Sequence, residues 1–283
     1  MGFYDEKKRI FQSVDTKNLL LLYGFLSHSG KLIFATFSGV YELVENPNNR
    51  FEFKPIDKIP NAKPHTILFE DNDQCLWSSY DVTSIRIYNP QKQYELVKEL
   101  PITGIITGFW HQPNTPIVWM CSQNGLFKID KNTWVVQTFT EAAGLPSRTI
   151  NAMQADAKMN LWLGTSKGLA KFDPSVNKAH AYNLVDGISD LNVNMYASAK
   201  AADGTLYFGT NNGITWFHPD KITPLSISAR PTITNMLIND QEAKNLLCTE
   251  TGATNISEIK HLELPYDKNT LSFTFQPWNT ATQ

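Results

Sequence analysis

Short apolar segments alternate with polar turns along most of the chain, and one arrangement of them repeats. In each copy an apolar segment that carries a large side chain ends in small residues. A turn follows, usually with a glycine, and a second apolar segment begins. The second position of the first segment falls at Ile33, Trp77, Trp119, Trp162 and Tyr207. The intervals of 42–45 residues are regular enough to indicate five copies of one structural unit.

The residue types within a copy predict β-strands. Residues 160–165 and 205–210 are short and rich in aromatic and branched side chains, as strands are. The turn after each of these segments holds a glycine, Gly168 or Gly213, that can adopt a positive φ. An aspartate-containing turn precedes the segment, and a fourth segment follows in most copies. Helical periodicity is nearly absent, so each copy is predicted to be a four-stranded antiparallel meander.

Four antiparallel strands in a repeat of this length are typical of a β-propeller blade. We therefore predict an all-β protein, a β-propeller of about five four-stranded blades. A single blade leaves both faces of its sheet exposed, so Trp77, Trp119 and Trp162 are expected to pack between neighbouring blades. The fifth copy lacks a fourth strand, and residues 4–13 have the pattern of an unattached one. Our hypothesis is that this N-terminal strand completes the last blade and covers its open edge.

Residues 222–283 do not follow the repeat. Residues 231–239 and 271–275 alternate with a period of two, as half-buried strands do, and a polar stretch at 249–257 lies between them. These roughly 60 residues are fewer than the roughly 100 of a complete β-sandwich. We predict two domains, a propeller over residues 1–221 and a truncated, partial β-sandwich over residues 222–283.

Charge and hydropathy narrow the classes of partner. The 25 Lys and Arg residues against 27 Asp and Glu give a formal charge of −2, which argues against a surface for nucleic acid or anionic membrane. No apolar run approaches the length that spans a bilayer, and the N-terminus has no hydrophobic signal core. The chain is expected to be either cytoplasmic or a piece of a longer exported protein.

Catalytic and metal-binding chemistry has little support. The sequence contains none of the common hydrolase, zinc-protease or phosphate-loop motifs. Three cysteines form no CxxC pair and are expected to be buried strand residues, and the six histidines have no ligand spacing. Asp156 and Asp203 are interpreted as one repeat position with a role in a turn. We expect no enzyme activity, no cofactor and no metal.

Several stretches resemble a known family. Those similar to the two-component regulator propeller repeat are Gly144-Leu145-Pro146-Ser147, Ile150-Asn151-Ala152-Met153, Leu161-Trp162-Leu163-Gly164-Thr165, Gly168-Leu169 and Phe172-Asp173-Pro174. Those similar to its closing repeat are Asp186-Gly187-Ile188, Asp203-Gly204-Thr205-Leu206-Tyr207-Phe208-Gly209-Thr210, Gly213-Ile214 and Phe217-His218-Pro219. Pro231-Thr232-Ile233-Thr234 and residues 264–273 resemble the start of a triple-tyrosine immunoglobulin-like domain. The first copy departs from the pattern with Ile33 in place of tryptophan, and the second has residues 81–84 in place of the glycine turn.

The resemblance implies a location and a function. Such regions are periplasmic ectodomains of hybrid two-component sensors in the inner membrane. They sense oligosaccharides from glycan breakdown, act as homodimers and signal to a histidine kinase and so to transcription. By this resemblance the chain would touch the membrane only through segments outside the given sequence. It would carry no catalytic site of its own.

A ligand is expected on the loops at one face of the propeller. Sugars are held by planar amide and guanidinium groups and by aromatic stacking. The loop residues with this chemistry are Tyr80, Arg148, Lys167, Asn192 and Asn211. Trp110 and His111 join them because they lie outside the repeated tryptophan position. Each of these could instead be a solvated loop residue, a turn former or, for Trp110, a cover for a neighbouring blade. The alternative function is a scaffold for dimerisation or protein interaction with no ligand site.

Overall fold

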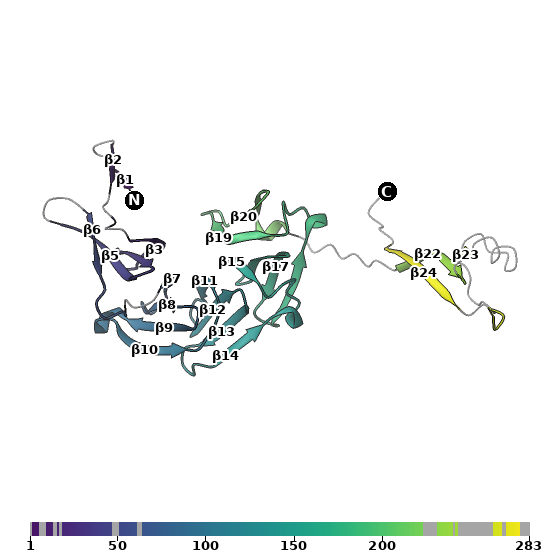
Figure 1. The fold of residues 1–283 in the computed structure, drawn as a ribbon, viewed down its shortest axis with the longest axis horizontal. Helices are drawn as coiled ribbons and strands as arrows, with labels where there is room; N and C mark the ends of the chain where they lie inside the picture. The colour runs from purple at the N-terminus through teal and green to yellow at the C-terminus, as the bar shows by residue number, and fades with distance from the viewer. Residues whose placement is uncertain are drawn as a thin grey trace. The chain divides into compact units, whose positions relative to one another are not determined.

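The computed structural model describes residues 2–5, 10–13, 16, 19–46, 51–60, 64–222, 231–239, 241–242, 263–267 and 270–277. The chain divides into two compact units, Met1–Ile222 and Thr223–Gln283 (Figure 1). The described helices are four single 3-10 turns: η1 (Pro90–Lys92), η2 (Glu141–Ala143), η3 (Leu184–Asp186) and η4 (Pro219–Lys221). None of the helices in the described part could cross a membrane.

The first unit contains five consecutive antiparallel sheets. Blade 1 is formed by β3 (Leu21–Leu26), β4 (Leu32–Thr36), β5 (Gly39–Glu45) and β6 (Phe51–Pro55). Blade 2 is formed by β7 (His65–Glu70), β8 (Leu76–Tyr80), β9 (Ser84–Asn89) and β10 (Glu95–Leu100). Blade 3 is formed by β11 (Ile106–His111), β12 (Ile117–Ser122), β13 (Gly125–Asp130) and β14 (Val136–Phe139). Blade 4 is formed by β15 (Ile150–Ala155), β16 (Leu161–Thr165), β17 (Gly168–Asp173) and β18 (Lys178–Tyr182). Blade 5 is formed by β19 (Val193–Lys200), β20 (Leu206–Thr210) and β21 (Gly213–Phe217).

The sheets follow one another around a common centre, with the first strand of each blade innermost (Figure 1). Consecutive first strands contact each other, from β3 to β7, β11, β15 and β19. This arrangement confirms the predicted all-β propeller of about five blades. The turns between second and third strands also behave as predicted, since Gly168 has a φ of 110° and Gly213 a φ of 122°. In blade 2, which lacks that glycine, Asp81 adopts the positive φ instead, at 53°.

The hypothesis about the N-terminal strand is wrong. Within residues 2–13 the structure has two strands, β1 (Gly2–Asp5) and β2 (Ile10–Ser13), which pair with each other in an antiparallel hairpin. Blade 5 has three strands in the order β19-β20-β21, with no strand from the N-terminus beside β21. The N-terminal strands therefore pair with each other and not with the open edge of blade 5.

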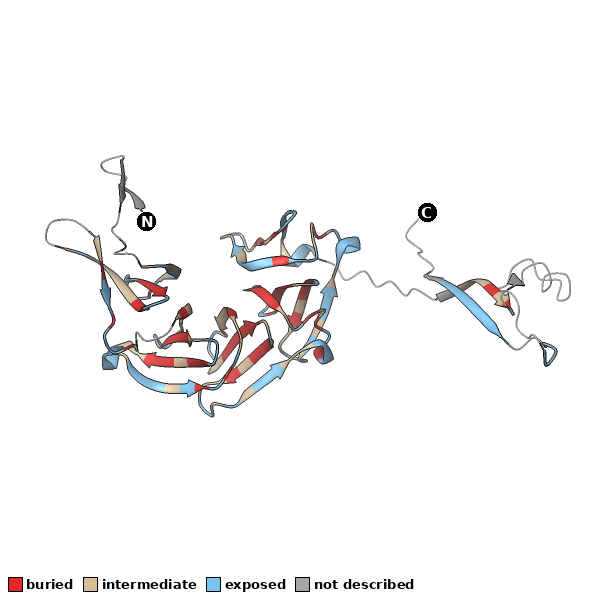
Figure 2. Ribbon diagram, viewed as in Figure 1, coloured by how far each residue is buried: buried red, intermediate tan, exposed pale blue. Residues whose placement is uncertain are grey.

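The core lies between the blades (Figure 2). Trp77, Trp119 and Trp162 are 0%, 0% and 1% exposed. Each contacts an aromatic ring of the following blade: Trp77 packs on Phe109, Trp119 on Phe172 and Trp162 on Phe217. These contacts confirm that the repeated tryptophans pack between neighbouring blades.

A buried aspartate fixes the turn that precedes the second strand in two of the blades. Asp156 Oδ1 accepts hydrogen bonds from the backbone N–H groups of Lys158 and Asn160, and its Oδ2 accepts one from Trp162 Nε1. Asp71 makes the same set of bonds in blade 2, to two backbone N–H groups and the Trp77 indole. One carboxylate therefore holds both the turn and the core tryptophan.

The interpretation of Asp156 and Asp203 as one repeat position is wrong. The backbone bond that closes the turn joins Asp156 N to Asn160 O in blade 4 and Ala201 N to Thr205 O in blade 5. Asp203 thus lies two residues further along its turn than Asp156. It bonds the backbone N–H of Thr205 and does not reach an indole.

The last blade leaves one sheet face uncovered. Tyr207, which occupies the position of Trp162, is 37% exposed, and its cross-strand partner Trp216 is 67% exposed. Within the described residues no further blade follows to cover them. The second unit contains β22 (Pro231–Ile238), β23 (Gln241–Glu242) and β24 (Leu271–Pro277) in one antiparallel sheet of order β23-β22-β24. The domain boundaries and the partial sandwich remain predictions.

Candidate ligand-binding site

An irregularity near the start of the first strand recurs in every blade. The pairing register between first and second strands shifts after Leu21, His65, Ile106, Ile150 and Val193. A β-bulge leaves residues out of the ladder and redirects their side chains. The largest shift is in blade 5, between Val193 and Ser198, where Tyr196 has a φ of 61°. Because of the five bulges, side chains that regular strands would direct elsewhere point to the centre of the propeller.

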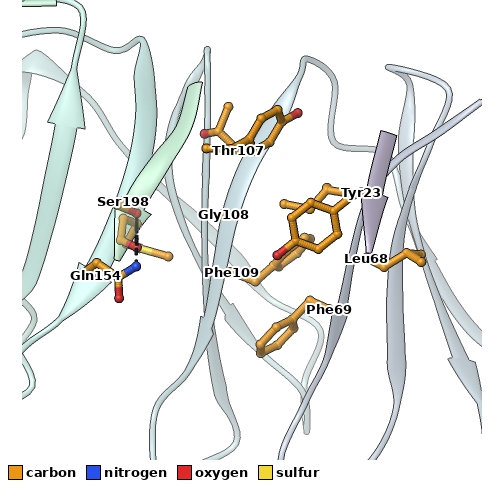
Figure 3. Close-up of a pocket in the computed structure, with 11 residues that line it drawn as sticks. Tyr23, Leu68, Phe69, Thr107, Gly108, Phe109, Gln154 and Ser198 are labelled. Atoms are coloured by element: carbon orange, nitrogen blue, oxygen red, sulfur yellow. Dashed lines mark hydrogen bonds between the residues drawn. The ribbon is translucent and has the colours of Figure 1, made fainter. Parts of the chain in front are cut away.

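A pocket of about 160 Å³ lies at this centre, and all five first strands line it (Figure 3). Its wall contains polar side chains on one side and aromatic side chains on the other. Gln154 and Ser198 form the polar side, where Gln154 Nε2 donates a hydrogen bond to Ser198 Oγ at 3.1 Å. Tyr23, Phe69 and Phe109 form the aromatic side. The wall is therefore amphipathic.

The aromatic side is made of rings from different blades that pack on one another. Phe69 and Phe109 are stacked, with ring centroids 5.3 Å apart and planes inclined by 7°. The rings of Tyr23 and Tyr196 lie 6.3 Å apart, and they join the first blade to the fifth. Burial raises the pKa of both tyrosines, so their hydroxyl groups keep their protons at neutral pH.

A ring of hydrogen bonds joins the bulges of blades 3, 4 and 5. Thr107 Oγ1 donates to the Ile150 carbonyl at 2.6 Å, and Asn151 Nδ2 donates to the Val193 carbonyl at 2.7 Å. The ring is completed by the hydroxyl of Tyr196, which donates to the Ile106 carbonyl at 3.2 Å. Each acceptor is the residue just before a bulge. The same irregularities that shape the pocket therefore also hold three blades together.

Most of the residues expected to bind ligand lie at one end of the blades. Arg148 and Asn192 precede first strands, and Lys167 and Asn211 lie in the turns between second and third strands. The pairing of Ile150 with Thr165 places these two kinds of loop at the same end. All four side chains are exposed, and Arg148 forms an ion pair with Glu141 at 3.6 Å. None of them lines the central pocket, and their role in binding remains a prediction.

Tyr80 is half-buried at the same end of blade 2, within a group of polar side chains. The Arg86 guanidinium lies 3.6 Å from its ring centre, and the His65 ring lies 5.3 Å away. Arg86 is paired with Glu99, whose Oε2 lies 3.2 Å from Arg86 Nε. His65 is fully buried, with Nε2 donating to the Pro60 carbonyl and Nδ1 accepting from Ser78. The Tyr80 side chain therefore packs against residues of its own blade.

We expect His65 to make the protein sensitive to mild acid. Burial lowers the pKa of His65, so the folded chain resists protonation there. The unfolded chain takes up that proton as the pH falls below about 6.5. The free energy of unfolding should therefore decrease as the pH falls from about 6.5 toward the folded-state pKa of His65. Urea titrations at closely spaced pH values measure this slope.

The matched variants are His65→Gln and His180→Gln, the second at an exposed histidine on β18. Only the first should flatten the dependence between pH 6.5 and the onset of carboxylate titration at about pH 4.5. An unchanged slope in His65→Gln would contradict this assignment.

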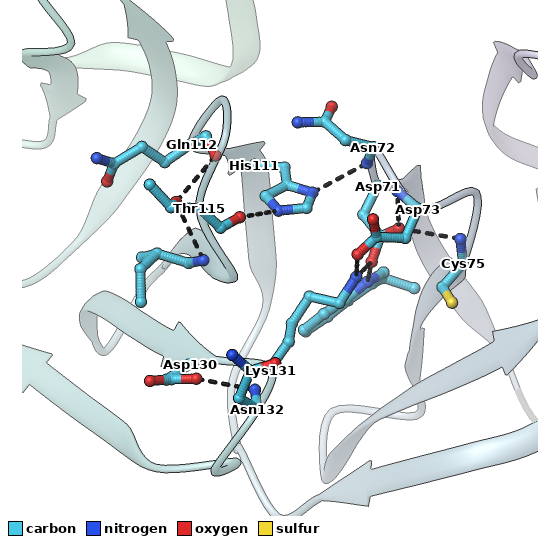
Figure 4. Close-up of polar contacts among 12 residues, drawn as sticks. Asp71, Asn72, Asp73, Cys75, His111, Gln112, Thr115, Asp130, Lys131 and Asn132 are labelled. Atoms are coloured by element: carbon cyan, nitrogen blue, oxygen red, sulfur yellow. Dashed lines mark hydrogen bonds and ion pairs between the residues drawn. The ribbon is translucent and has the colours of Figure 1, made fainter.

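Trp110 and His111 lie at the opposite end of the blade from these loops. Trp110 pairs across the strands with Trp119 and packs against the core cluster between blades 3 and 4. His111 accepts a hydrogen bond at Nδ1 from the backbone of Asn72, and its Nε2 donates to the Thr115 carbonyl (Figure 4). Beside it, Lys131 of blade 3 is paired with Asp71 and Asp73 of blade 2. His111 and Lys131 thus join two blades, and a ligand role for Trp110 and His111 remains a prediction.

Cysteine and metal chemistry add little to the site. Cys121 is buried as expected, and burial raises its pKa to about 12, while Cys75 is half-buried. Cys248 lies outside the described residues. Among the described residues, no group of three His, Cys, Asp or Glu side chains is placed to hold a metal ion.

The pocket residues were missed because they share a strand, the first of each blade, and not a residue type. Tyr23, Phe69, Phe109, Gln154 and Ser198 all lie on first strands, between the third and the sixth residue of each strand. The sequence repeat could have identified these positions, because it locates the first strand of every blade. The first strand of a propeller blade faces the axis, so side chains at these positions converge whatever their chemistry.

The chain is similar to known proteins in sequence and in fold. No family model matches the sequence. Over 97% of its length the chain is 23% identical to histidine kinase P4 of Formosa agariphila, and it spans 20% of that protein. The chain therefore corresponds to about a fifth of the curated relative that it matches.

Solved structures agree on the architecture. The chain resembles the extracellular domain of the hybrid two component system BT3049 from B. thetaiotaomicron, with a TM-score of 0.72 and 19% identity. This similarity covers 98% of the chain and 38% of that domain. A second extracellular domain from the same organism, of the hybrid system BT4673, gives a TM-score of 0.60 at 18% identity over 97% of the chain and 38% of that domain. A catalytically inactive virginiamycin B lyase from Staphylococcus aureus is also similar, with a TM-score of 0.54 and 16% identity over 78% of the chain and 75% of that enzyme. Two of these three neighbours are thus extracellular domains of hybrid two component systems, the class of sensor that the sequence resembles.

Proposed function

We infer that the chain is the extracytoplasmic ligand-sensing region of a hybrid two-component sensor. In this proposal the region lies in the periplasm as part of an inner-membrane protein and acts as a homodimer. It detects oligosaccharides from glycan breakdown and signals through a histidine kinase to transcription. The observation that carries the proposal is the similarity over nearly the whole chain to an extracellular domain of such a system. The histidine kinase among its relatives supports the same assignment.

The pocket gives the proposal a physical basis. A sensor needs a site whose occupancy changes the relation between parts of the protein, and this pocket is lined by strands of all five blades. A ligand there would contact the first and fifth blades together. Propellers also include enzymes, such as the similar lyase, so fold alone does not assign chemistry. We propose binding without catalysis.

A thermal-shift screen of the chain against a library of plant, algal and host oligosaccharides tests this proposal. A ligand that binds only the folded state raises the melting temperature, by an amount that grows with its concentration. We expect at least one oligosaccharide to do so and to remain uncleaved by mass spectrometry. Cleavage of the ligand would contradict the assignment as a sensor without catalysis.

The second candidate function is a scaffold for dimerisation or protein interaction with no ligand site. The exposed face of blade 5, with Tyr207 and Trp216, favours it, because such a face can be covered by a partner. The same screen separates the two functions. No shift with any oligosaccharide, together with a stable dimer in analytical ultracentrifugation, would favour the scaffold.

A further inference from the structure

We propose that the central pocket binds one uncharged pyranose ring, the terminal unit of a carbohydrate chain. This inference rests on the proposed function and specifies where the ligand binds and of what kind it is. It comes from three properties of the pocket: its size, its two unlike walls and the absence of charge among its lining residues.

The size of the pocket limits it to a single ring. Its volume is about 160 Å³. A cavity of roughly 150 Å³ in another protein accommodates benzene, a single six-membered ring. A disaccharide needs about twice this space, so further units of the chain would extend outside. The pocket is not sealed, since Tyr196 on its wall is 39% exposed. A ligand can therefore occupy it with one end.

The two walls match the two kinds of surface on a pyranose. The C–H groups on one face of the ring pack on aromatic side chains, here Tyr23 and Phe109, while hydroxyl groups at its edge need hydrogen-bond partners. Gln154 carries both a donor and an acceptor in its amide, and Ser198 carries a hydroxyl that can do either. In Figure 3 these two residues lie across the pocket from the aromatic rings.

The lining residues specify a neutral sugar. They are apolar, aromatic, hydroxyl or amide residues and include no Lys, Arg, His, Asp or Glu. A carboxylate or sulfate buried there would lose its hydration without gaining a cation, which is costly. The pocket should therefore accept a neutral hexose and reject the uronic acid of the same stereochemistry. The cationic loop residues Arg148 and Lys167 do not line it.

The experiment uses matched pairs of monosaccharides with the full chain: D-glucose against D-glucuronate, D-galactose against D-galacturonate, and D-mannose against D-mannuronate. Calorimetric titration should show binding of at least one neutral sugar, and its uronate should bind at least about tenfold more weakly. Equal binding of both members of a pair, or tighter binding of the uronate, would overturn the proposal.

Substitutions inside and outside the pocket test where the sugar binds. Gln154→Ala and Ser198→Ala should each raise the Kd for the neutral sugar by about tenfold, the loss of a hydrogen bond to the ligand. Lys178→Ala, at an exposed position of the outer strand β18, is the control and should leave the Kd unchanged, while Lys167→Ala and Asn211→Ala test the alternative site on the loops. Melting temperatures without sugar show that each variant is folded. If Gln154→Ala does not fold, Ser198→Ala alone tests the site.

The failure of this proposal is distinguishable from failure of the proposed function. If an oligosaccharide binds but the pocket variants leave its Kd unchanged while a loop variant weakens it, the central site is wrong and the sensor function stands. If no carbohydrate in the library or among the monosaccharides binds, both are wrong.

Discussion

Replacing Trp119 with alanine should lower the free energy of unfolding by about 3–5 kcal/mol, the usual cost of truncating a large buried aromatic side chain. Trp119 is fully buried and lies in one cluster with Leu161 and Phe172 of the next blade. Its removal leaves a cavity between two blades that rigid sheets cannot easily close. Urea unfolding followed by circular dichroism measures the loss.

Trp216→Ala is the matched control for Trp119→Ala. It removes the same side chain at a position that is 67% exposed in blade 5. Its effect should be much smaller, because little surface is returned to water. Equal losses for the two variants would mean that the blades do not pack as the structure has them.

Asp156→Ala should have the second largest effect, a loss of about 3 kcal/mol, because each buried donor left without a partner costs about 1–3 kcal/mol. The substitution leaves the Trp162 indole N–H and the backbone N–H groups of Lys158 and Asn160 without their acceptor. These donors lie in and beside the core of blade 4, where water can replace the carboxylate only in part. Thermal and urea unfolding both report the change.

Asp203→Ala provides the control for Asp156→Ala. Its carboxylate bonds the Thr205 backbone at the surface and reaches no tryptophan. We expect little change in its free energy of unfolding. Comparable losses in both variants would support one shared repeat position and contradict the structural alignment of the two turns.

The repeat was sufficient to predict the blades because it places large apolar residues at a fixed interval. Trp77, Trp119 and Trp162 each pack on an aromatic ring of the following blade, so the same kind of interface forms between successive blades. The alignment of the turns does not follow from this interval alone. Aspartate bonds backbone N–H groups at several positions of a turn, so Asp203 resembled Asp156 without sharing its contact to an indole.

The N-terminus and the pocket could not be derived from local pattern. Residues 4–13 contain apolar residues on both sides of the charged run at residues 6–9, and that pattern fits one strand or two. The pocket depends on β-bulges and on side chains from five distant strands. Tyr196 reaches the centre through a positive φ, which is uncommon for a tyrosine and gives no signal in sequence.

The most direct test of the central claim, that five blades surround one pocket, is a cross-link between the first and fifth blades. The structure brings the rings of Tyr23 and Tyr196 to 6.3 Å from each other in the wall of the pocket. A chain with Tyr23→Cys and Tyr196→Cys, treated with a short bis-maleimide and mapped by mass spectrometry, should give a cross-linked pair of the two peptides. If each variant with only one of the two substitutions is labelled by maleimide at its new cysteine, but the double variant yields no such pair, the first and fifth blades do not meet and the account is contradicted.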